Sequence, residues 1–257
     1  MGRLIKKIVK AFLPYGLVVL IKNRVKYYFV IKNFFLNNKI IDCKNIPIII
    51  NNRNHYDYLL RLIGFLEKCK YNNIIILDNS STYPPLLDYY NLTKYRVIYL
   101  NKNIGHMALN ECPLWDEVSK SYFVYTDPDI VPVEDCPENF LEYFVSVMKK
   151  DLVLQKVGFS LKIDDLPNSY NKKQNVIDWE SQFWNVKIKG GNYIAPIDTT
   201  FALHRPGVKS SFLSGYLKHC RTGFPYMARH LPWYENSNNL SENIMYYYKN
   251  TEKGNNW

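Results

Sequence analysis

The stretch Tyr122-Phe123-Val124-Tyr125-Thr126-Asp127-Pro128-Asp129 decides the predicted fold, because an apolar run passes directly into two carboxylates. A run that is apolar at successive positions is typical of a parallel strand covered on both faces of its sheet. Pro128 restricts Asp127 to extended backbone, and residues two apart on such a backbone project to the same side. We therefore expect Asp127 and Asp129 to face a common ligand at the end of a buried strand.

Three earlier apolar runs also end in polar residues. They are Ile46 to Ile50 before Asn51–Asn54, Ile74 to Leu77 before Asp78–Ser80, and Arg96 to Leu100 before Asn101. Segments of helical or loop character, such as Tyr56 to Lys68, separate these runs, and this alternation predicts an α/β fold with a mainly parallel central sheet flanked by helices. Ligands of such sheets bind outside the carboxyl ends of the strands, so the polar ends predict one shared crevice for a nucleotide-type ligand.

Two carboxylates on one side of a strand end would suit a hard cation. Mg²⁺ or Mn²⁺ is the expected cofactor, with diphosphate oxygens and water completing its coordination. Such an ion would neutralise the charge that grows on a departing nucleoside diphosphate. Because an isolated Asp-x-Asp is most often a solvated turn, this prediction depends on the position of Asp127 and Asp129 at a buried strand end.

Composition indicates one globular domain. The chain has 257 residues, of which 47% are hydrophobic and 16% aromatic, which is enough to bury a substantial core. Its five cysteines are scattered and include no CxxC pair, which argues against a disulfide framework or a zinc knuckle and predicts reduced thiols in a cytoplasmic protein. No repeat and no Gly/Ser linker occurs, so we expect a single domain over residues 42–257.

The net charge of +10 lies almost wholly in the first 41 residues, which hold nine Lys or Arg and no acidic residue. The remaining chain is nearly neutral overall. Nucleic-acid binding is therefore the least favoured function, because that function needs cations around the predicted crevice.

Residues 1–41 also interleave their cations with apolar residues. The longest uncharged stretch, between Lys10 and Lys22, contains Pro14 and is shorter than the roughly 20 residues that a spanning helix needs. No small-residue cleavage site of a secretory signal follows it. We expect a basic amphipathic segment on an anionic membrane surface, peripheral on the inner face of the cell membrane, with a basic helix packed on the domain as the alternative. Within this segment, Leu4, Ile5, Ile8 and Phe12 are spaced as on one side of a helix.

Four motifs, taken in order, resemble those of the Rossmann-like GT-A glycosyltransferase fold, and the chain is similar to glycosyltransferase family 2 and its bacterial lipopolysaccharide or capsule relatives. The resemblance spans residues 45 to 135. It implies a metal-dependent enzyme that moves a sugar from a nucleoside diphosphate sugar, with UDP-sugar favoured, to a bacterial surface glycan or glycolipid acceptor. The motifs are Asn51-Asn52-Arg53-Asn54, Asp78-Asn79-Ser80-Ser81, Asn101-Lys102-Asn103-Ile104-Gly105 and Asp127-Pro128-Asp129.

The resemblance also implies roles for individual residues. The nucleotide would be bound by Asn51, Asn52, Arg53, Asp78, Asn103, Gly105, His106 and Asp127. The metal would be bound by Asp127, Asp129 and a late histidine, His230. The alternatives are that Asn51 and Asn103 shape caps or turns and that Arg53 forms a surface ion pair.

The C-terminal half supplies candidates for catalysis and for the acceptor. An inverting transferase needs a carboxylate to deprotonate the acceptor hydroxyl, and Asp198 and Glu180 are the candidates, with a cap or an ion pair as the alternative role of each. A retaining enzyme would instead use such a group to orient the acceptor or to stabilise an oxocarbenium-like centre. The Glu-Asp pair that family 2 commonly places before a late helix does not occur, so the choice of base and the stereochemistry stay open. Trp179, Thr199 and Trp233 are expected to contact the acceptor, because sugar C–H faces pack on aromatic rings; packing in the core would equally explain aromatic residues here.

Two other functions share parts of this pattern. A nucleotidyltransferase would use the same framework and metal, but it usually begins with a Gly-rich phosphate loop, and none occurs near residues 46–60. A catalytically silent, membrane-attached module would bind the sugar nucleotide without turnover.

Overall fold

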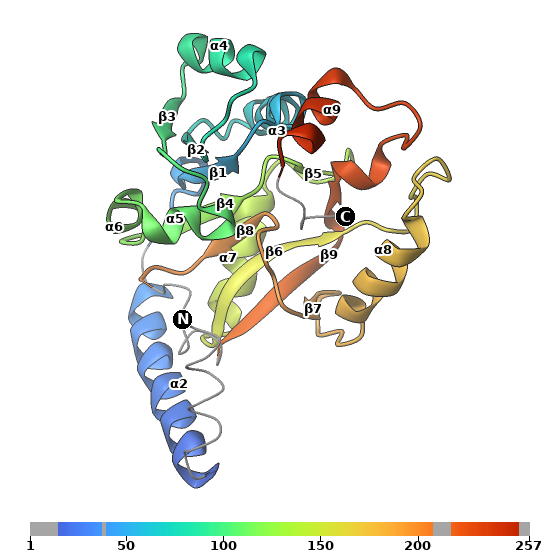
Figure 1. Ribbon diagram of the computed structural model, residues 1–257. Helices are drawn as coiled ribbons and strands as arrows, with labels where there is room; N and C mark the ends of the chain where they lie inside the picture. The colour runs from blue at the N-terminus through green and yellow to red at the C-terminus, as the bar shows by residue number, and fades with distance from the viewer. Residues whose placement is uncertain (1–14, 38–39, 208–216, 252–257) are drawn as a thin grey trace.

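The computed structural model describes residues 15–37, 40–207 and 217–251 of the chain (Figure 1). The described residues form an α/β fold in which helices flank a nine-stranded mixed sheet of order β3-β2-β1-β4-β8-β6-β9-β5, with β7 paired to β9. The expected helical spacing of Leu4, Ile5, Ile8 and Phe12 lies outside the described residues.

The strands are β1 (Ile48–Asn52), β2 (Ile74–Asp78), β3 (Arg96–Tyr99), β4 (Phe123–Thr126), β5 (Ile130–Pro132), β6 (Leu154–Leu161), β7 (Tyr193–Ile194), β8 (Ala202–His204) and β9 (Lys218–His230). The α-helices are α2 (Tyr15–Asn37), α3 (Tyr56–Lys68), α4 (Pro84–Leu92), α5 (Ala108–Glu111), α6 (Leu114–Val118), α7 (Phe140–Lys150), α8 (Lys173–Glu180) and α9 (Glu242–Lys249). Short 3-10 helices are η1 (Cys43–Asn45), η2 (Gly105–Met107), η3 (Ser181–Trp184) and η5 (Leu231–Tyr234).

The four predicted apolar runs form β1 to β4, and these strands are parallel as expected. β1 pairs with β2 on one side and with β4 on the other, and β3 pairs with β2. The helix predicted between the first two strands is α3, with the predicted bounds. The sheet is mixed beyond β4, because β8 runs antiparallel to both β4 and β6, while β5 and β7 run antiparallel to β9.

Successive side chains of β1 point into two different cores, as the alternation of a strand requires. Ile48 and Ile50 pack into the cluster that contains the buried residues of α3 and α7. Ile49 packs into a second cluster with the buried residues of α5 and α6. Helices therefore cover both faces of the sheet at β1, which explains its run of three buried isoleucines; the edge strand β3 is more exposed.

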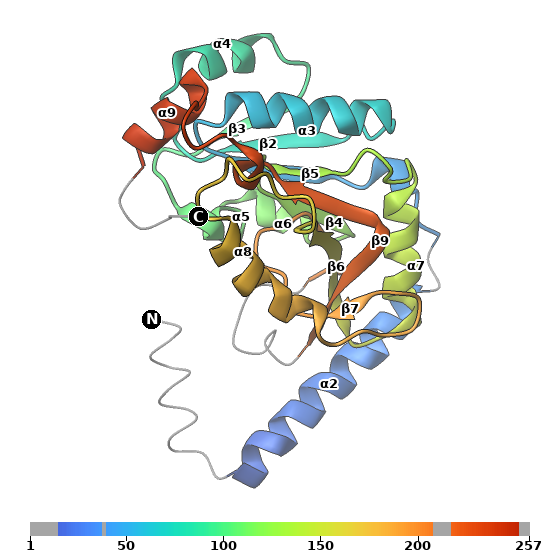
Figure 2. The same cartoon turned by 90° about the vertical axis from the view of Figure 1, so that its right-hand side faces the viewer.

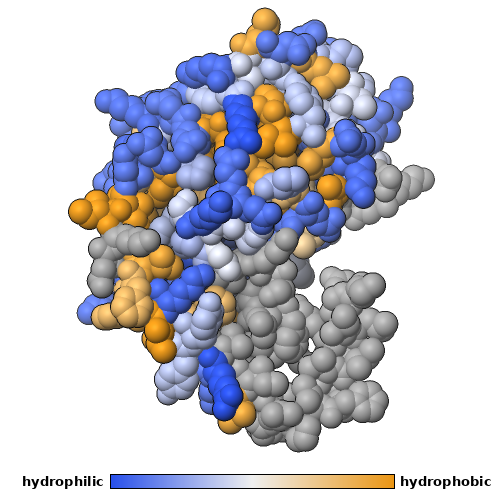
Figure 3. All heavy atoms as spheres, turned by 90° about the vertical axis from the view of Figure 1, so that its left-hand side faces the viewer, coloured by the Kyte–Doolittle hydropathy of each residue, from blue (hydrophilic) through white to orange (hydrophobic). Residues whose placement is uncertain are grey.

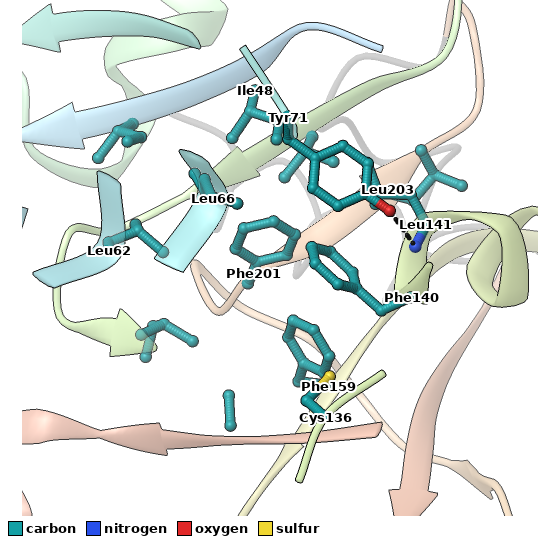
Figure 4. Close-up of a cluster of buried hydrophobic side chains, with 14 of the residues drawn as sticks. Ile48, Leu62, Leu66, Tyr71, Cys136, Phe140, Leu141, Phe159, Phe201 and Leu203 are labelled. Atoms are coloured by element: carbon teal, nitrogen blue, oxygen red, sulfur yellow. Dashed lines mark hydrogen bonds between the residues drawn. The ribbon is translucent and has the colours of Figure 1, made fainter. Parts of the chain in front are cut away.

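Aromatic rings fill the larger core (Figure 4). The Phe140 ring lies 5.3 Å from that of Phe159 and 5.6 Å from that of Phe201 between ring centroids, so α7, β6 and the residue before β8 pack together. The buried Tyr71 hydroxyl accepts the Leu141 N–H at 3.3 Å. This contact fixes the start of α7 against the segment that leads into β2.

Arg205 joins the sheet to α7 and α2 from inside the protein, where it is 1% exposed. Its guanidinium donates to the carbonyl oxygens of Met148 and Asp151 at the end of α7 and to that of Leu154 in β6. It also donates to the Asn37 side chain at the end of α2, at 3.1 Å. The last carbonyls of a helix have no partner within the helix, and this buried cation satisfies them.

All five cysteines are buried and free. Within the ranges that the structure describes, no helix combines the length and the apolar character that crossing a bilayer requires.

We predict that Arg205→Met will lower the free energy of unfolding by about 3 kcal/mol, because several buried carbonyls lose their donor at once. Urea unfolding followed by circular dichroism measures the change. Arg96→Met is the matched control, since Arg96 forms only an exposed ion pair with Glu117 at 2.7 Å and its loss should cost less than about 1 kcal/mol. Equal changes in the free energy of unfolding for the two substitutions would contradict a stabilising role of the buried Arg205 hydrogen bonds.

Candidate functional site

A cavity of about 820 Å³ opens at the carboxyl ends of β1 and β4. These neighbouring strands mark the point where the sheet order reverses, because β2 and β3 continue on the far side of β1. Ligands of open α/β sheets bind at such a reversal, outside the strand ends. Asn51 of β1 and Asp127, which follows β4, both line the cavity.

The pairing of β5 with β9 brings His230 to the two carboxylates. Ile130 lies opposite His230 in the antiparallel register, so the preceding residue, Asp129, lies next to the histidine. His230 Nε2 is 3.3 Å from Asp129 Oδ2, and these side chains are 20% and 13% exposed. Backbone bonds hold the group in place: Asp127 N–H donates to Thr199 O at 3.1 Å, and Leu231 N–H donates to Asp129 O at 2.8 Å.

The pKa values of the two carboxylates shift in opposite directions. Burial raises the pKa of Asp127, and the charge of Asp129 raises it further. Burial also raises the pKa of Asp129, but the neighbouring His230 and then His55 outweigh this effect, so the net shift of the Asp129 pKa is downward. Two partly buried acids thus share a region where a cation would be stabilising.

Two polar atoms at this position lack hydrogen-bond partners within the described chain: Asp129 Oδ1 and His230 Nδ1. Buried polar atoms are nearly always satisfied, so each of the two needs a partner that the described chain does not supply. No group of three or more His, Cys, Asp or Glu side chains in the described residues is arranged to hold a metal by itself. Asp127, Asp129 and His230 are thus not placed to hold a cation together among the described residues, and a cation beside Asp129 would take most of its ligands from phosphate and water.

Amide side chains build the opposite wall of the cavity. Asn79, which follows β2, accepts the Ile104 N–H at 2.7 Å and donates to Gly105 O at 3.1 Å. Asn103 Oδ1 accepts the Gly105 N–H at 3.0 Å, and Gly105 has a positive φ of 67°, which glycine adopts without strain. Asn103 therefore shapes the turn, as the alternative interpretation held, and it also lines the cavity.

Asp78 lies beneath this wall, outside the cavity lining, and is 2% exposed. Its Oδ1 accepts from the Tyr90 hydroxyl at 3.2 Å and its Oδ2 accepts the Ser81 N–H at 3.1 Å. Asn52 is also buried outside the lining, and its side chain donates to the Tyr90 hydroxyl at 2.8 Å. Both side chains cross-link the strand ends, while the neighbouring Asn79 faces the cavity. Their predicted contact with a nucleotide stays a prediction.

Arg53 lines the cavity as a cation without an ion pair among the described residues. Its Nη2 lies 3.5 Å from Asn250 O, and its Nε has no hydrogen-bond partner within the described chain. The alternative, in which Arg53 forms a surface ion pair, is therefore not seen among the described residues. A guanidinium with free donors is suited to bind a phosphate group.

The predicted site residues fall into two groups, those that line the cavity and those that do not. Trp179 is 51% exposed on α8, and Trp233 is 5% exposed with its ring centroid 4.6 Å from that of His230. The predicted residues that line the cavity are Asn51, Arg53, Asn103, Gly105, His106, Asp127, Asp129, Asp198, Thr199 and His230. Those outside its lining are Asn52, Asp78, Trp179, Glu180 and Trp233.

The two candidate bases lie in contrasting surroundings. Asp198 lines the cavity, is exposed, and makes no side-chain ion pair among the described residues. Glu180 is 2% exposed, and its Oε1 accepts from Arg221 Nη1 in a buried ion pair. Burial raises the pKa of Glu180, although Arg221 opposes that shift. The Glu180 carboxylate is buried in its ion pair with Arg221 and is poorly accessible to a substrate, whereas the Asp198 carboxylate is accessible.

Sequence reasoning missed the wall formed by α9. This short helix contributes Ile244, Tyr247 and Tyr248 to the cavity, and the Tyr247 ring lies 3.9 Å from that of His55 between centroids. Burial lowers the pKa of His55 to about 4, with smaller effects from Asp129, which raises it, and from His230, which lowers it. The N-cap at Ser241 could have predicted a helix start, but no local signal places that helix over the site.

Asn243 attaches α9 to the first turn of α3. Its Oδ1 accepts the N–H groups of Tyr56 and Asp57 at 2.9 and 3.3 Å, and its Nδ2 donates to Asn54 O at 2.8 Å. The residue at the N-cap of α3, His55, makes no side-chain capping bond. Asn243 therefore caps α3 from a distant part of the chain.

Comparison with known proteins gives no family at this point: the sequence matches no protein-family model and no curated protein.

We predict that Asn243→Ala will destabilise the protein by about 1–2 kcal/mol, because α3 loses its cap and α9 its attachment. Hydrogen exchange should show faster exchange at the amides of Tyr56 and Asp57. Asn238→Ala, at an exposed asparagine in the preceding turn, is the control and should leave both rates unchanged. Unchanged protection of Tyr56 and Asp57 in Asn243→Ala would refute the capping role.

Proposed function

We propose that the chain is a metal-dependent glycosyltransferase of GT-A type that transfers a sugar from a nucleoside diphosphate sugar to a hydroxyl of a glycan or lipid-linked acceptor. The observation that carries the proposal is the grouping of Asp127, Asp129 and His230 in a cavity at the reversal of the strand order. The four motifs of the sequence resemblance support it, since each lies at or just beyond the carboxyl end of one of the strands β1 to β4.

Asp129 and His230 would hold the Mg²⁺ or Mn²⁺ ion, with Asp127 beside them, through the atoms that lack partners. When bound, such an ion neutralises the negative charge that develops on the leaving diphosphate. Arg53 would bind a phosphate oxygen through its free donors at the same rim. Asn51, near the carboxyl end of β1, and Asn79, the residue after β2, would donate amide groups to the nucleoside.

Asp198 is the preferred base for the acceptor hydroxyl. Its carboxylate is accessible from the cavity, next to Thr199, whose carbonyl oxygen is bonded to the main chain of Asp127. Deprotonating the hydroxyl as the bond to the sugar forms would lower the barrier to transfer. Glu180 is the weaker candidate, because releasing it from Arg221 would leave a buried charge unpaired.

We predict that Asp129→Asn will reduce sugar transfer or donor hydrolysis at least about 100-fold, because the cation loses a charged ligand. The assay measures nucleoside diphosphate release from a panel of UDP- and GDP-sugars with and without Mn²⁺. Asp135→Asn, at an exposed acid outside the cavity lining, should retain full activity.

Two results would contradict the proposal. One is wild-type turnover by Asp129→Asn. The other is release of pyrophosphate from nucleoside triphosphates with no release of diphosphate from any sugar nucleotide, which would indicate a nucleotidyltransferase. A thermal shift with sugar nucleotides in the absence of any turnover would instead indicate a binding module.

A second prediction separates the candidate bases. Asp198→Asn should lower kcat by about 100-fold or more while the affinity for the donor stays within a factor of a few. Glu180→Gln should instead lower the free energy of unfolding by about 2 kcal/mol or more, because Arg221 loses its buried counter-charge, and should leave kcat per folded molecule unchanged. The reverse pattern, with kcat lost only in Glu180→Gln, would exclude Asp198 as the base.

A further inference from the structure

We infer that one face of α2 docks on an anionic lipid surface. This inference goes beyond the proposed enzymatic activity and does not depend on it. It depends on how α2 is attached to the protein, on what its other face exposes, and on the charge of the surrounding sequence.

The inner face of α2 is held by residues spaced four apart, which lie above one another on a helix. Phe29 is 9% exposed and Asn33 is 2% exposed. Asn33 Nδ2 donates to Leu152 O at 2.7 Å, and Asn37 Nδ2 donates to Lys149 O at 2.8 Å. With the Asn37 contact to Arg205, these bonds fix the C-terminal turns of α2 on the end of α7.

The outer face carries large apolar and aromatic side chains that nothing in the described chain covers. We call this face the aromatic stripe, and its exposed fractions are 51% for Leu20, 71% for Tyr27, 59% for Ile31, 56% for Phe34 and 67% for Phe35. Steps of seven, four and three or four residues keep these positions on one side of a helix. Asn23 and Arg24 are exposed on the same side between Leu20 and Tyr27, so the apolar positions are continuous only from Tyr27 to Phe35. So many large exposed apolar side chains are unusual for a surface that faces only water.

Charge favours lipid over a second copy of the chain as the partner. Residues 1–41 hold nine cations and no acid; within α2, Arg24 and Lys26 are exposed, whereas Lys32 donates to Pro206 O at 3.1 Å. Two such helices packed together would bring like charges close, which is destabilising. An anionic membrane surface would attract the same cations, while Tyr and Phe side chains settle at the boundary between headgroups and acyl chains.

The shape of the molecule is compatible with this docking. α2 projects from the rest of the fold, at the opposite end from α9 (Figures 1 and 2). In Figure 3 the coloured atoms in the lower part of the molecule show hydrophobic and hydrophilic residues interspersed at the surface. Because α9 lines the cavity, binding through α2 leaves the cavity open.

Co-sedimentation of the full chain with vesicles tests the inference. We expect binding to phosphatidylcholine vesicles that contain about 30% phosphatidylglycerol, weak binding to pure phosphatidylcholine, and release by high salt. The double variant Phe34→Ser/Phe35→Ser should lower the partition coefficient at least about tenfold. Leu92→Ser, at an 85% exposed leucine at the end of α4, is the matched control and should bind like the wild type.

A charge variant completes the design. Arg24→Gln/Lys26→Gln should weaken binding to the anionic vesicles several-fold and leave binding to neutral vesicles unchanged. All substituted residues are exposed, so unchanged circular dichroism and melting temperature should accompany each variant.

Three outcomes would overturn the inference: no binding of the wild type to anionic vesicles, full binding of the Phe34/Phe35 variant, or a wild-type dimer that the same variant converts to a monomer without any vesicle binding. The last result would assign the aromatic stripe to a second copy of the chain. None of these measurements uses a sugar donor, so failure of the proposed enzymatic function would not alter them.

Discussion

The parallel pairing of β1 with β4 is the constraint on which the candidate site depends. Ile50 lies opposite Thr126, so both strands end at the same edge of the sheet and deliver Asn51 and Asp127 to it together. Later parts of the chain are then attached to this edge by main-chain bonds. Asp127 N–H binds Thr199 O, and the pairing of β5 with β9 sets His230 beside Asp129. Residues from three regions thus meet because backbone register, rather than side-chain affinity, brings them together.

The sequence predicted what local patterns encode. The strands β1 to β4 and the bounds of α3 follow from short apolar runs and their polar ends, and those ends lie at one edge because parallel strands share a direction. The pairing partners beyond β4 were not predictable in the same way. β9 is 13 residues long and mixes buried and exposed positions, with the buried Arg221 among them, so it shows neither a continuous apolar run nor a clean alternation. Asn79 rather than Asp78 lines the cavity, because the Asp78 carboxylate accepts hydrogen bonds from Tyr90 and Ser81. Residue spacing in the sequence does not reveal these contacts.

The buried arginines Arg205 and Arg221 have hydrogen-bond or ion-pair partners within the protein. Arg205 is surrounded by carbonyl and side-chain oxygens, and Arg221 is paired with Glu180 and donates to Pro196 O at 2.8 Å. Leaving such groups unpaired would cost several kcal/mol each. Asp129 Oδ1 and His230 Nδ1 lack partners within the described chain, and so do buried atoms outside the cavity lining, such as Ser160 Oγ. At the cavity, Arg53 Nε lacks a partner as well, so a ligand bound there would lie among several polar atoms that the fold leaves unpaired.

The attachment of α9 makes the cavity wall and the strand edge parts of one structure. Asn243 binds the first turn of α3, and α3 begins only four residues after β1 ends, so displacement of α9 would uncap the helix that supports the site. The Tyr247 ring lies 3.9 Å from that of His55 between centroids, and burial lowers the pKa of His55 to about 4, ahead of the opposing effect of Asp129. A ligand that contacts both α9 and the strand edge would add its binding energy to the stability of their attachment.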